Sequence, residues 1–188
     1  QTILTKSSFK NALIVGEVGV GRKSIVQAVA KKCYLGQTLP ELNDKRVVEL
    51  DMVALLARIQ DPETLETTID AILSEVASAG NVILVIDDLD KFVGQDTQKP
   101  GTVDISGILA KYLAHPNFLI IAITSYDGLH RKIEQTPSFL EYFRKVEVSE
   151  ISEIDTIKVL QNLAIEFEQK NKILILYPAI RDIVNLTA

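Results

Sequence analysis

The stretch at residues 12–23, which reads ALIVGEVGVGRK, decides the fold of this chain. Residues 12–15 form an apolar run typical of a buried strand, which leads directly into a glycine-rich segment. A helix-like segment follows at residues 24–33. A strand, a glycine-rich turn and a helix N-terminus together place backbone N–H groups and the positive end of a helix dipole at one point. That arrangement suits an anion, and it predicts a polyphosphate site.

The glycine spacing follows the phosphate-loop pattern G-x-x-x-x-G-K-[ST], but the ending differs. In that pattern the Lys contacts the β- and γ-phosphates, and the Ser/Thr hydroxyl binds Mg²⁺. Gly16 and Gly21 keep the spacing, and the next two residues are Arg22 and Lys23. A register shifted by one residue would need glycines at positions 17 and 22, and neither is glycine, so we reject it. The candidate nucleotide-binding residues are Gly16, Val18, Gly19, Val20, Gly21, Arg22, Lys23 and Ser24.

Composition narrows the function classes. Twenty basic and twenty-five acidic residues give a net charge of −5, so no basic footprint for nucleic acid is expected. The longest apolar run is far shorter than the roughly 20 residues that a membrane-spanning helix needs. The single Cys33 excludes an internal disulfide, and with the isolated His115 and His130 it offers no metal-ligand spacing. We expect Cys33 in the core and the chain in the reducing cytoplasm.

Apolar runs typical of strands alternate with segments of helical periodicity. Strands that are apolar throughout and alternate with helices favour a parallel sheet covered on both faces. We therefore predict an α/β fold with a five-stranded, mostly parallel sheet between helices. The strand-like runs are residues 13–15, 47–50, 82–86, 118–123 and 146–148, and helical spacing marks residues 65–76 and 105–112.

The pattern changes near Ser149. Ser152 and Asp155 offer a capping-box-like helix start, and apolar residues at helical spacing follow as far as Phe167. Pro178 is expected to open another helix. We predict a nucleotide-binding α/β domain at residues 1–150 and the beginning of a small helical domain at residues 151–188.

A second motif consists of two acids that follow an apolar strand. Residues 82–86 end in Asp87 and Asp88, at the edge of an open α/β sheet where ligands bind. In phosphate-loop ATPases the first such acid holds Mg²⁺ and the second orients or deprotonates the attacking water. Asp87 is the candidate metal ligand, and Asp88 is the candidate base, although it is one methylene shorter than the usual Glu. Asp90 is expected to be a solvated loop residue.

With both motifs placed, nearly the whole chain resembles the first AAA+ module of the Clp/Hsp100 protein unfoldases and disaggregases. The resemblance is carried by residues 11–21, 46–56, 80–94, 121–125 and 143–148, together with 155–157 and 178–180. It implies a phosphate-loop AAA+ domain followed by a helical lid, and binding of ATP or ADP with Mg²⁺. It also implies hexameric rings of AAA+ subunits that act on protein substrates, and a peptidase as a further candidate partner. Thr124, at the end of the fourth core strand, matches the family's polar sensor and is the second candidate catalytic residue.

The resemblance fails at several of the family's working positions. Asp61 stands where the pore loop carries its substrate-gripping aromatic residue, and Glu141 and Tyr142 stand in place of the pair of arginine fingers. Arg144 lies two residues beyond that pair. The family comparison also implies that the chain begins after the segment lining the adenine pocket and ends before the lid's second sensor. Since it begins at Gln1 without a methionine, we expect a segment of a longer protein.

The changes in the phosphate loop have physical consequences. Arg22 can contact phosphate through its planar fork, but it is bulkier than Lys in a tight loop. Lys23 removes a metal-ligating oxygen and places an ammonium near the Mg²⁺ position, where like charges repel by about 1 kcal/mol in water and about 4 kcal/mol at an effective dielectric of 20. We therefore expect a module weak or inactive in ATP hydrolysis that serves as a ring scaffold or regulatory tier. The alternative is an active ATPase that drives protein unfolding with variant motifs. A third hypothesis, an unrelated phosphate-loop enzyme such as a kinase, is disfavoured because the sequence contains no substrate-site motif.

Overall fold

The computed structural model describes residues 1–5, 10–94 and 104–187, and it divides into two compact units, Gln1–Val148 and Ser149–Ala188. The first unit contains one sheet, with strand order β2-β3-β4-β1-β5. Every pairing in this sheet is parallel, so the predicted α/β fold with a five-stranded parallel sheet is confirmed. Its strands are β1 (Asn11–Gly16), β2 (Arg46–Glu49), β3 (Val82–Ile86), β4 (Leu119–Thr124) and β5 (Phe143–Val148).

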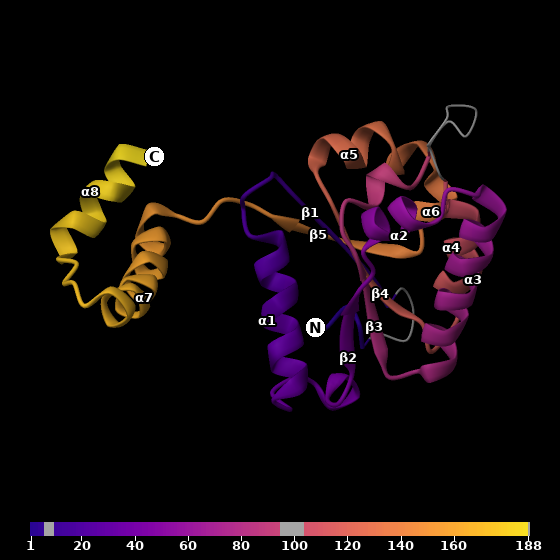
Figure 1. Ribbon diagram of the computed structural model, residues 1–188, viewed down its shortest axis with the longest axis horizontal. Helices are drawn as coiled ribbons and strands as arrows, with labels where there is room; N and C mark the ends of the chain where they lie inside the picture. The colour runs from indigo at the N-terminus through magenta and orange to yellow at the C-terminus, as the bar shows by residue number, and fades with distance from the viewer. Residues whose placement is uncertain (6–9, 95–103, 188) are drawn as a thin grey trace. The chain divides into compact units, whose positions relative to one another are not determined.

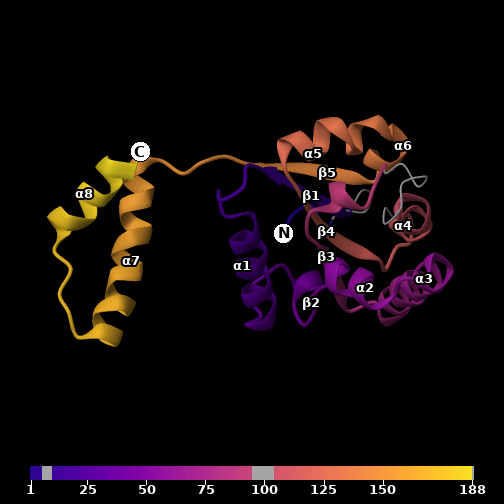
Figure 2. The same cartoon turned by 45° about the horizontal axis from the view of Figure 1, so that its top comes forward.

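Helices cover both faces of the sheet. Figures 1 and 2 show α1 on one face and α3 and α4 on the other. Short 3-10 turns, η1 (Pro40–Leu42), η2 (Leu89–Lys91) and η3 (Ile133–Gln135), lie between them in the chain. The helices of the first unit are α1 (Arg22–Tyr34), α2 (Met52–Arg58), α3 (Pro62–Ala79), α4 (Ser106–Leu113), α5 (Tyr126–Arg131) and α6 (Pro137–Leu140).

The strand β1 is buried along its whole length because both of its faces are covered. Leu13 and Val15 belong to the core cluster that α3 and α4 cover, while Ala12 and Ile14 belong to the cluster on the α1 side. Cys33 of α1 lies in this second cluster with 1% of its surface exposed, so the prediction that it is a core residue is confirmed. Burial raises the pKa of its thiol.

The second unit is a pair of helices, α7 (Glu153–Asn171) and α8 (Tyr177–Thr187). The hydroxyl of Ser152 accepts a hydrogen bond from the backbone N–H of Asp155, so the predicted helix start is confirmed. Pro178 lies in the first turn of α8, as predicted. The two helices pack through small and branched side chains, with Ala164, Ile180 and Val184 buried. Within the described residues no helix is long and apolar enough to cross a membrane.

Gly16 ties the end of β1 to the neighbouring strand β5. A Cβ atom built on Gly16 would lie 2.5 Å from the carbonyl oxygen of Val148 and 3.0 Å from Cγ2 of Val20. The first of these distances is to backbone, so the strand itself would have to shift. Gly16 is therefore required by close packing between β1 and β5, before any ligand is considered.

We expect Gly16→Ala to lower the free energy of unfolding because β5 must move away from the new methyl group. Gly107 is a matched control, since it lies exposed in α4 and a built Cβ meets no described atom within 4 Å beyond its chain neighbours and its own helix backbone. Gly107→Ala should leave stability unchanged or raise it by about 0.5–1 kcal/mol, as expected for Gly to Ala in a helix. Urea unfolding of both variants provides the test, and equal effects would contradict it.

Candidate functional site

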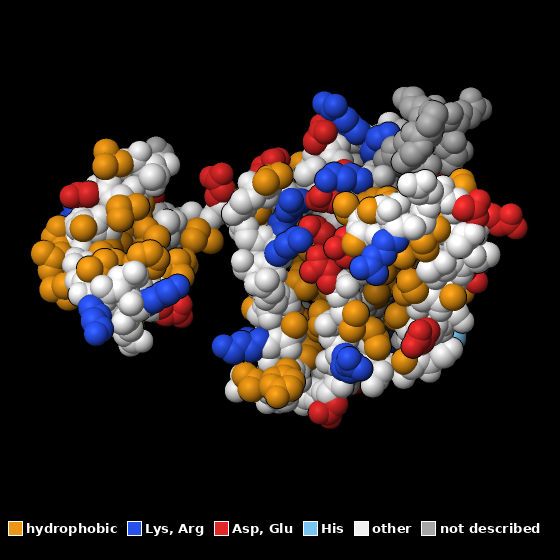
Figure 3. All heavy atoms as spheres, viewed as in Figure 1, with side chains coloured by type: hydrophobic (Ala, Val, Ile, Leu, Met, Phe, Trp, Pro, Cys, Tyr) orange, Lys and Arg blue, Asp and Glu red, His pale blue; other side chains and the backbone are white. Residues whose placement is uncertain are grey.

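Three parallel strands bring the predicted site residues to one edge of the sheet. Val15 of β1 is paired with Thr124 of β4, and Ile86 of β3 is paired with Ala122 of the same strand. The glycine-rich loop after β1, the two acids after β3 and the end of β4 therefore meet at the carboxyl edge. Figure 3 shows acidic side chains lying among basic ones on this face of the first unit.

The loop between β1 and α1 has the geometry of an anion cradle. Gly19 and Gly21 have φ angles of 98° and 94°, in the left-handed region that favours glycine. Gly21 is the N-cap of α1 and, as a glycine, supplies no side-chain cap to the first turn. Because the first N–H groups of a helix have no intrahelical acceptor, those of α1 can donate to a bound anion. The adjoining Ser24 is exposed on this first turn.

Arg22, which replaces the phosphate-binding Lys, carries a donor without an acceptor. Its side-chain nitrogen Nη1 is buried and makes no hydrogen bond to any described residue. An unpaired buried donor costs about 1–3 kcal/mol, and more when the group is charged. A phosphate oxygen is the acceptor that a guanidinium matches best. The described residues therefore leave this guanidinium nitrogen unsatisfied, and it lies on the residue that directly follows the glycine-rich loop.

Lys23 forms an ion pair with Asp87, the candidate metal ligand. Its Nζ is 2.8 Å from Oδ2 of Asp87 and 3.3 Å from Oε1 of Glu49. The hydrogen bond to Asp87 is the largest cause of a raised Lys23 pKa, and Glu49 adds to it. The ammonium is thus fully charged near neutral pH and occupies one oxygen of Asp87. The sequence predicted the ammonium near the metal position but did not predict its contact with Glu49. That contact arises because β2, which ends at Glu49, lies next to β3 in the sheet.

The residues at this site do not fit a magnesium ion. Mg²⁺ prefers six oxygen ligands in octahedral geometry. Position 23 supplies an ammonium in place of a hydroxyl oxygen, and Asp87 already pairs with that ammonium. Within the described ranges no group of three or more His, Cys, Asp or Glu side chains could hold a metal ion.

Asp88, the candidate base, has an ion pair of its own. Its backbone is in the left-handed region, with φ 48° and ψ 46°, at the start of η2. Its Oδ2 lies 2.6 Å from Nζ of Lys91, three residues later in the same turn. The hydrogen bond to Asp88 is the largest cause of a raised pKa of Lys91, so the candidate base faces a charged ammonium near neutral pH. The sequence pattern alone did not reveal this contact.

Thr124, the candidate sensor, donates to Asp90. The Thr124 side chain is fully buried, and its Oγ1 donates to Oδ1 of Asp90 at 2.7 Å. The prediction that Asp90 is a solvated loop residue is therefore wrong. A Cβ built on Gly128 would lie 2.6 Å from Oδ2 of Asp90, so the carboxylate fits closely against α5. This contact joins η2 to the end of β4.

Asp61, at the position that matches the pore-loop aromatic residue, is a helix cap. Its carboxylate accepts from the backbone N–H of Thr64 at 2.8 Å, which fixes the start of α3. The hydrogen bonds from Thr64 lower the pKa of this carboxyl group. At the finger positions, Tyr142 packs against the core and Glu141 ends α6. Arg144 lies exposed in β5.

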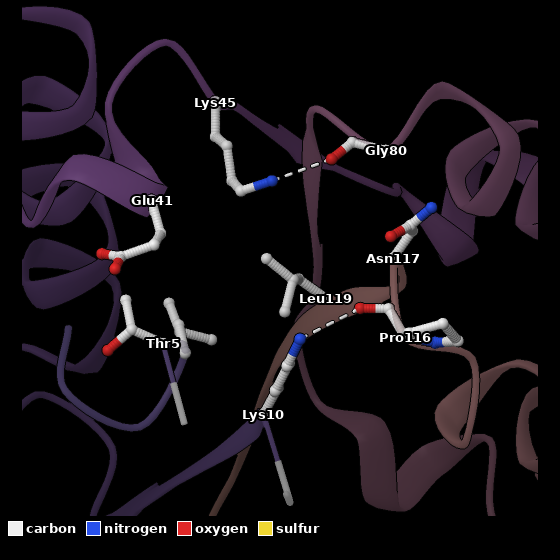
Figure 4. A pocket seen from close by; sticks show the side chains of 9 residues that line it. Thr5, Lys10, Glu41, Lys45, Gly80, Pro116, Asn117 and Leu119 are labelled. Carbon is white, nitrogen blue, oxygen red and sulfur yellow. Dashed lines mark hydrogen bonds between the residues drawn. The ribbon is translucent and has the colours of Figure 1, made fainter. Parts of the chain in front are cut away.

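A small cavity lies at the other end of the sheet. Figure 4 shows Lys10 and Lys45 reaching into it, each donating to a backbone carbonyl, of Pro116 at 3.3 Å and of Gly80 at 2.8 Å. Its volume is about 170 Å³, and Glu41, Asn117 and Leu119 also line it. Each of the two ammonium groups thus donates one hydrogen bond to the protein within this cavity.

A parallel sheet with a glycine-rich loop before a helix, and acids at the carboxyl edge, defines a phosphate-loop nucleotide-binding domain. Residues 12–148 match the family "ATPase family associated with various cellular activities (AAA)". Since this match covers most of the chain, the chain belongs to the AAA family.

The chain is also similar to Clp chaperones and proteases. It is 35% identical over 185 residues to the chaperone protein ClpB of Aquifex aeolicus, covering 98% of this chain and 18% of ClpB. It is 32% identical to the ATP-dependent Clp protease ATP-binding subunit ClpC of Staphylococcus aureus, covering 98% of this chain and 22% of ClpC. The predicted resemblance to Clp/Hsp100 AAA+ modules is thereby confirmed. The chain spans about a fifth of the length of these relatives.

A solved structure shows the same fold. The chain superposes on Saccharomyces cerevisiae Hsp104 in its extended complex with casein, with a TM-score of 0.84 and 24% identity. The match covers 98% of this chain and 31% of that one. The AAA+ α/β fold of this chain is therefore that of the Hsp104 module.

We expect Thr124→Val to lower the free energy of unfolding by about 1–3 kcal/mol, because a hydrogen bond to a charged group is lost without a change of shape. Thr124→Ser is the control, since it keeps the hydroxyl donor to Asp90. Chemical denaturation should rank wild type and Ser above Val. A Val variant as stable as the Ser variant would show that the hydroxyl contributes nothing.

We expect Asp61→Ala to lower the melting temperature and Asp61→Asn to preserve it, since Asn caps helices as well as Asp does. The folded pKa of Asp61 is depressed, so its charge stabilises the fold above the unfolded value of about 3.8 and this contribution is lost as pH falls below it. The difference between wild type and Asp61→Ala should shrink below that pH. Thermal scans at pH 6 and pH 3 measure it, and a constant difference would contradict it.

Proposed function

We propose that this chain is an AAA+ module of a Clp/Hsp100-like protein-remodelling machine that holds ATP or ADP and hydrolyses it weakly or not at all. In this role it serves as a ring scaffold or a regulatory tier. The observation that carries the proposal is the ion pair between Lys23 and Asp87 at 2.8 Å. It engages the acid on which metal-assisted phosphoryl transfer would depend.

Two further contacts support low activity. Asp88 pairs with Lys91, and the hydroxyl of Thr124 is committed to Asp90. Both candidate catalytic groups therefore have protein partners in place of water and phosphate. Arginine fingers contribute roughly 10³–10⁵ in rate where they operate, and Glu141 and Tyr142 cannot supply that positive charge. These losses fall in separate steps of catalysis, so one compensation does not restore the rate.

The proposed partners follow from the Clp/Hsp100 likeness. We propose that other AAA+ subunits form a hexameric ring with this module, and that the assembly acts on protein substrates in the cytoplasm. ClpC is named as the ATP-binding subunit of a protease, which makes a peptidase a further proposed partner. We assign residues 1–150 to the large nucleotide-binding domain and 151–188 to the beginning of the lid.

A second candidate function is an active ATPase whose loop uses Arg22 and Asp88 in altered geometry. Two observations favour it. The glycines of the loop keep a cradle conformation, and Nη1 of Arg22 is buried without an acceptor in the part of the chain that the structure describes. In this candidate Arg22 holds the phosphates and Asp88 leaves Lys91 to orient the attacking water.

We expect phosphate release by this chain, in ATP with MgCl₂, to equal that of its Asp88→Ala variant. Removing an idle base changes nothing, whereas removing a working base costs about 10²–10⁴ in rate. Steady release that Asp88→Ala abolishes would support the second candidate and contradict the first. A variant with Arg22→Lys, Lys23→Thr and Asp88→Glu restores the usual motif residues and should release more phosphate than wild type.

A further inference from the structure

We propose that the phosphate loop takes its polyphosphate ligand free of divalent metal, with the Lys23 ammonium as a built-in cation. The inference rests on the proposed nucleotide-holding function and specifies the chemical form of the ligand. It follows from two observations at the same edge of the sheet. The residues present do not fit Mg²⁺, whereas they do fit an anion.

The first observation is how Lys23 is held. Glu49 ends β2 and Asp87 follows β3, and these neighbouring strands are paired in parallel. Their carboxylates accept from the same ammonium at 3.3 and 2.8 Å. An ammonium has three N–H donors. Two are engaged by carboxylates, so the third is available to a phosphate oxygen while Lys23 stays in place.

The second observation is that the loop carries further hydrogen-bond donors and positive charge that an anion can use. Arg22 adds a guanidinium whose Nη1 has no acceptor among the described residues, and the first N–H groups of α1 face the same loop. A polyphosphate would satisfy these donors together with the free N–H of Lys23. The cations of the site are thus covalently attached side chains, and their number does not change with the magnesium concentration.

A divalent ion would have to displace this arrangement. Asp87 would need to release Lys23, and no hydroxyl at position 23 could replace the lost oxygen ligand. An ion entering without that release would lie beside a like charge. Magnesium in solution also binds ATP, so it competes with the protein for the polyphosphate oxygens. Mg²⁺ should therefore not strengthen nucleotide binding, and this is the opposite of the usual phosphate-loop behaviour.

Calorimetric titration of the chain with ATP, and with inorganic tripolyphosphate, tests this proposal. Tripolyphosphate is included because it needs no adenine pocket. Each ligand is titrated once in EDTA and once in MgCl₂. We expect binding in EDTA, and an affinity in MgCl₂ that is equal or weaker by roughly fivefold, the equivalent of about 1 kcal/mol. Free Mn²⁺, followed by electron paramagnetic resonance, should be depleted no further by protein with ATP than by ATP alone.

The matched pair of variants is Lys23→Ser and Lys158→Ser. Both remove a lysine that lies 2.8 Å from an aspartate, but Lys158 pairs with Asp155 at the start of α7. Lys23→Ser restores a hydroxyl and frees Asp87, so Mg²⁺ should now increase its affinity for ATP severalfold. Lys158→Ser should respond to Mg²⁺ as wild type does. Circular dichroism confirms that each variant is folded, and the wild-type titrations do not depend on either variant.

The outcomes separate this inference from the proposed function. Wild-type affinity that rises with Mg²⁺ overturns the inference, and phosphate release at background then leaves the proposed function standing. Release above background together with that rise overturns both. Absence of binding in EDTA and in MgCl₂ also overturns the inference and leaves only the scaffold role. A folded Lys23→Ser variant that gains nothing from Mg²⁺ removes Lys23 as the cause.

Discussion

The burial of β1 on both faces is the constraint on which the site depends. This strand lies between β4 and β5, and its side chains fill both core clusters. Its end is closely packed, because Gly16 lies against the backbone of Val148. The loop that follows therefore begins from a fixed point, in register with Thr124 on the neighbouring strand. Lys23, the second residue of α1, reaches Glu49 at the end of β2 and Asp87 directly after β3.

Most of the fold could be predicted from hydrophobic pattern alone. Each of the five strand-like runs is a strand, and the helical periodicity at residues 65–76 lies within α3. These elements are buried on one or both faces, so their periodicity reflects the core directly. The ends of the strands could not all be predicted from this pattern. β5 begins at Phe143, three residues before the apolar run, because its exposed residues Arg144 and Lys145 carry no hydrophobic signal.

The site could be predicted only as a set of positions. Sequence spacing identified the loop and the two acids, since glycines and strand ends have fixed places in a parallel sheet. It could not show which charges pair. Lys23 with Asp87, Asp88 with Lys91 and Thr124 with Asp90 are choices among rotamers and neighbouring strands. The sequence singled out Asp61 only because the related proteins have an aromatic residue at that position. The structure shows that its side chain caps α3.

The buried thiol of Cys33 gives this chain an internal reporter. The only cysteine lies in α1, and 1% of its surface is exposed. A thiol reagent can reach it only when α1 lifts from the sheet, in a local opening of the kind that hydrogen exchange detects. The rate at which the thiol is labelled then reports how often α1, the helix that follows the phosphate loop, opens away from the sheet. An anion bound at the start of that helix should lower the labelling rate, whatever its chemical nature.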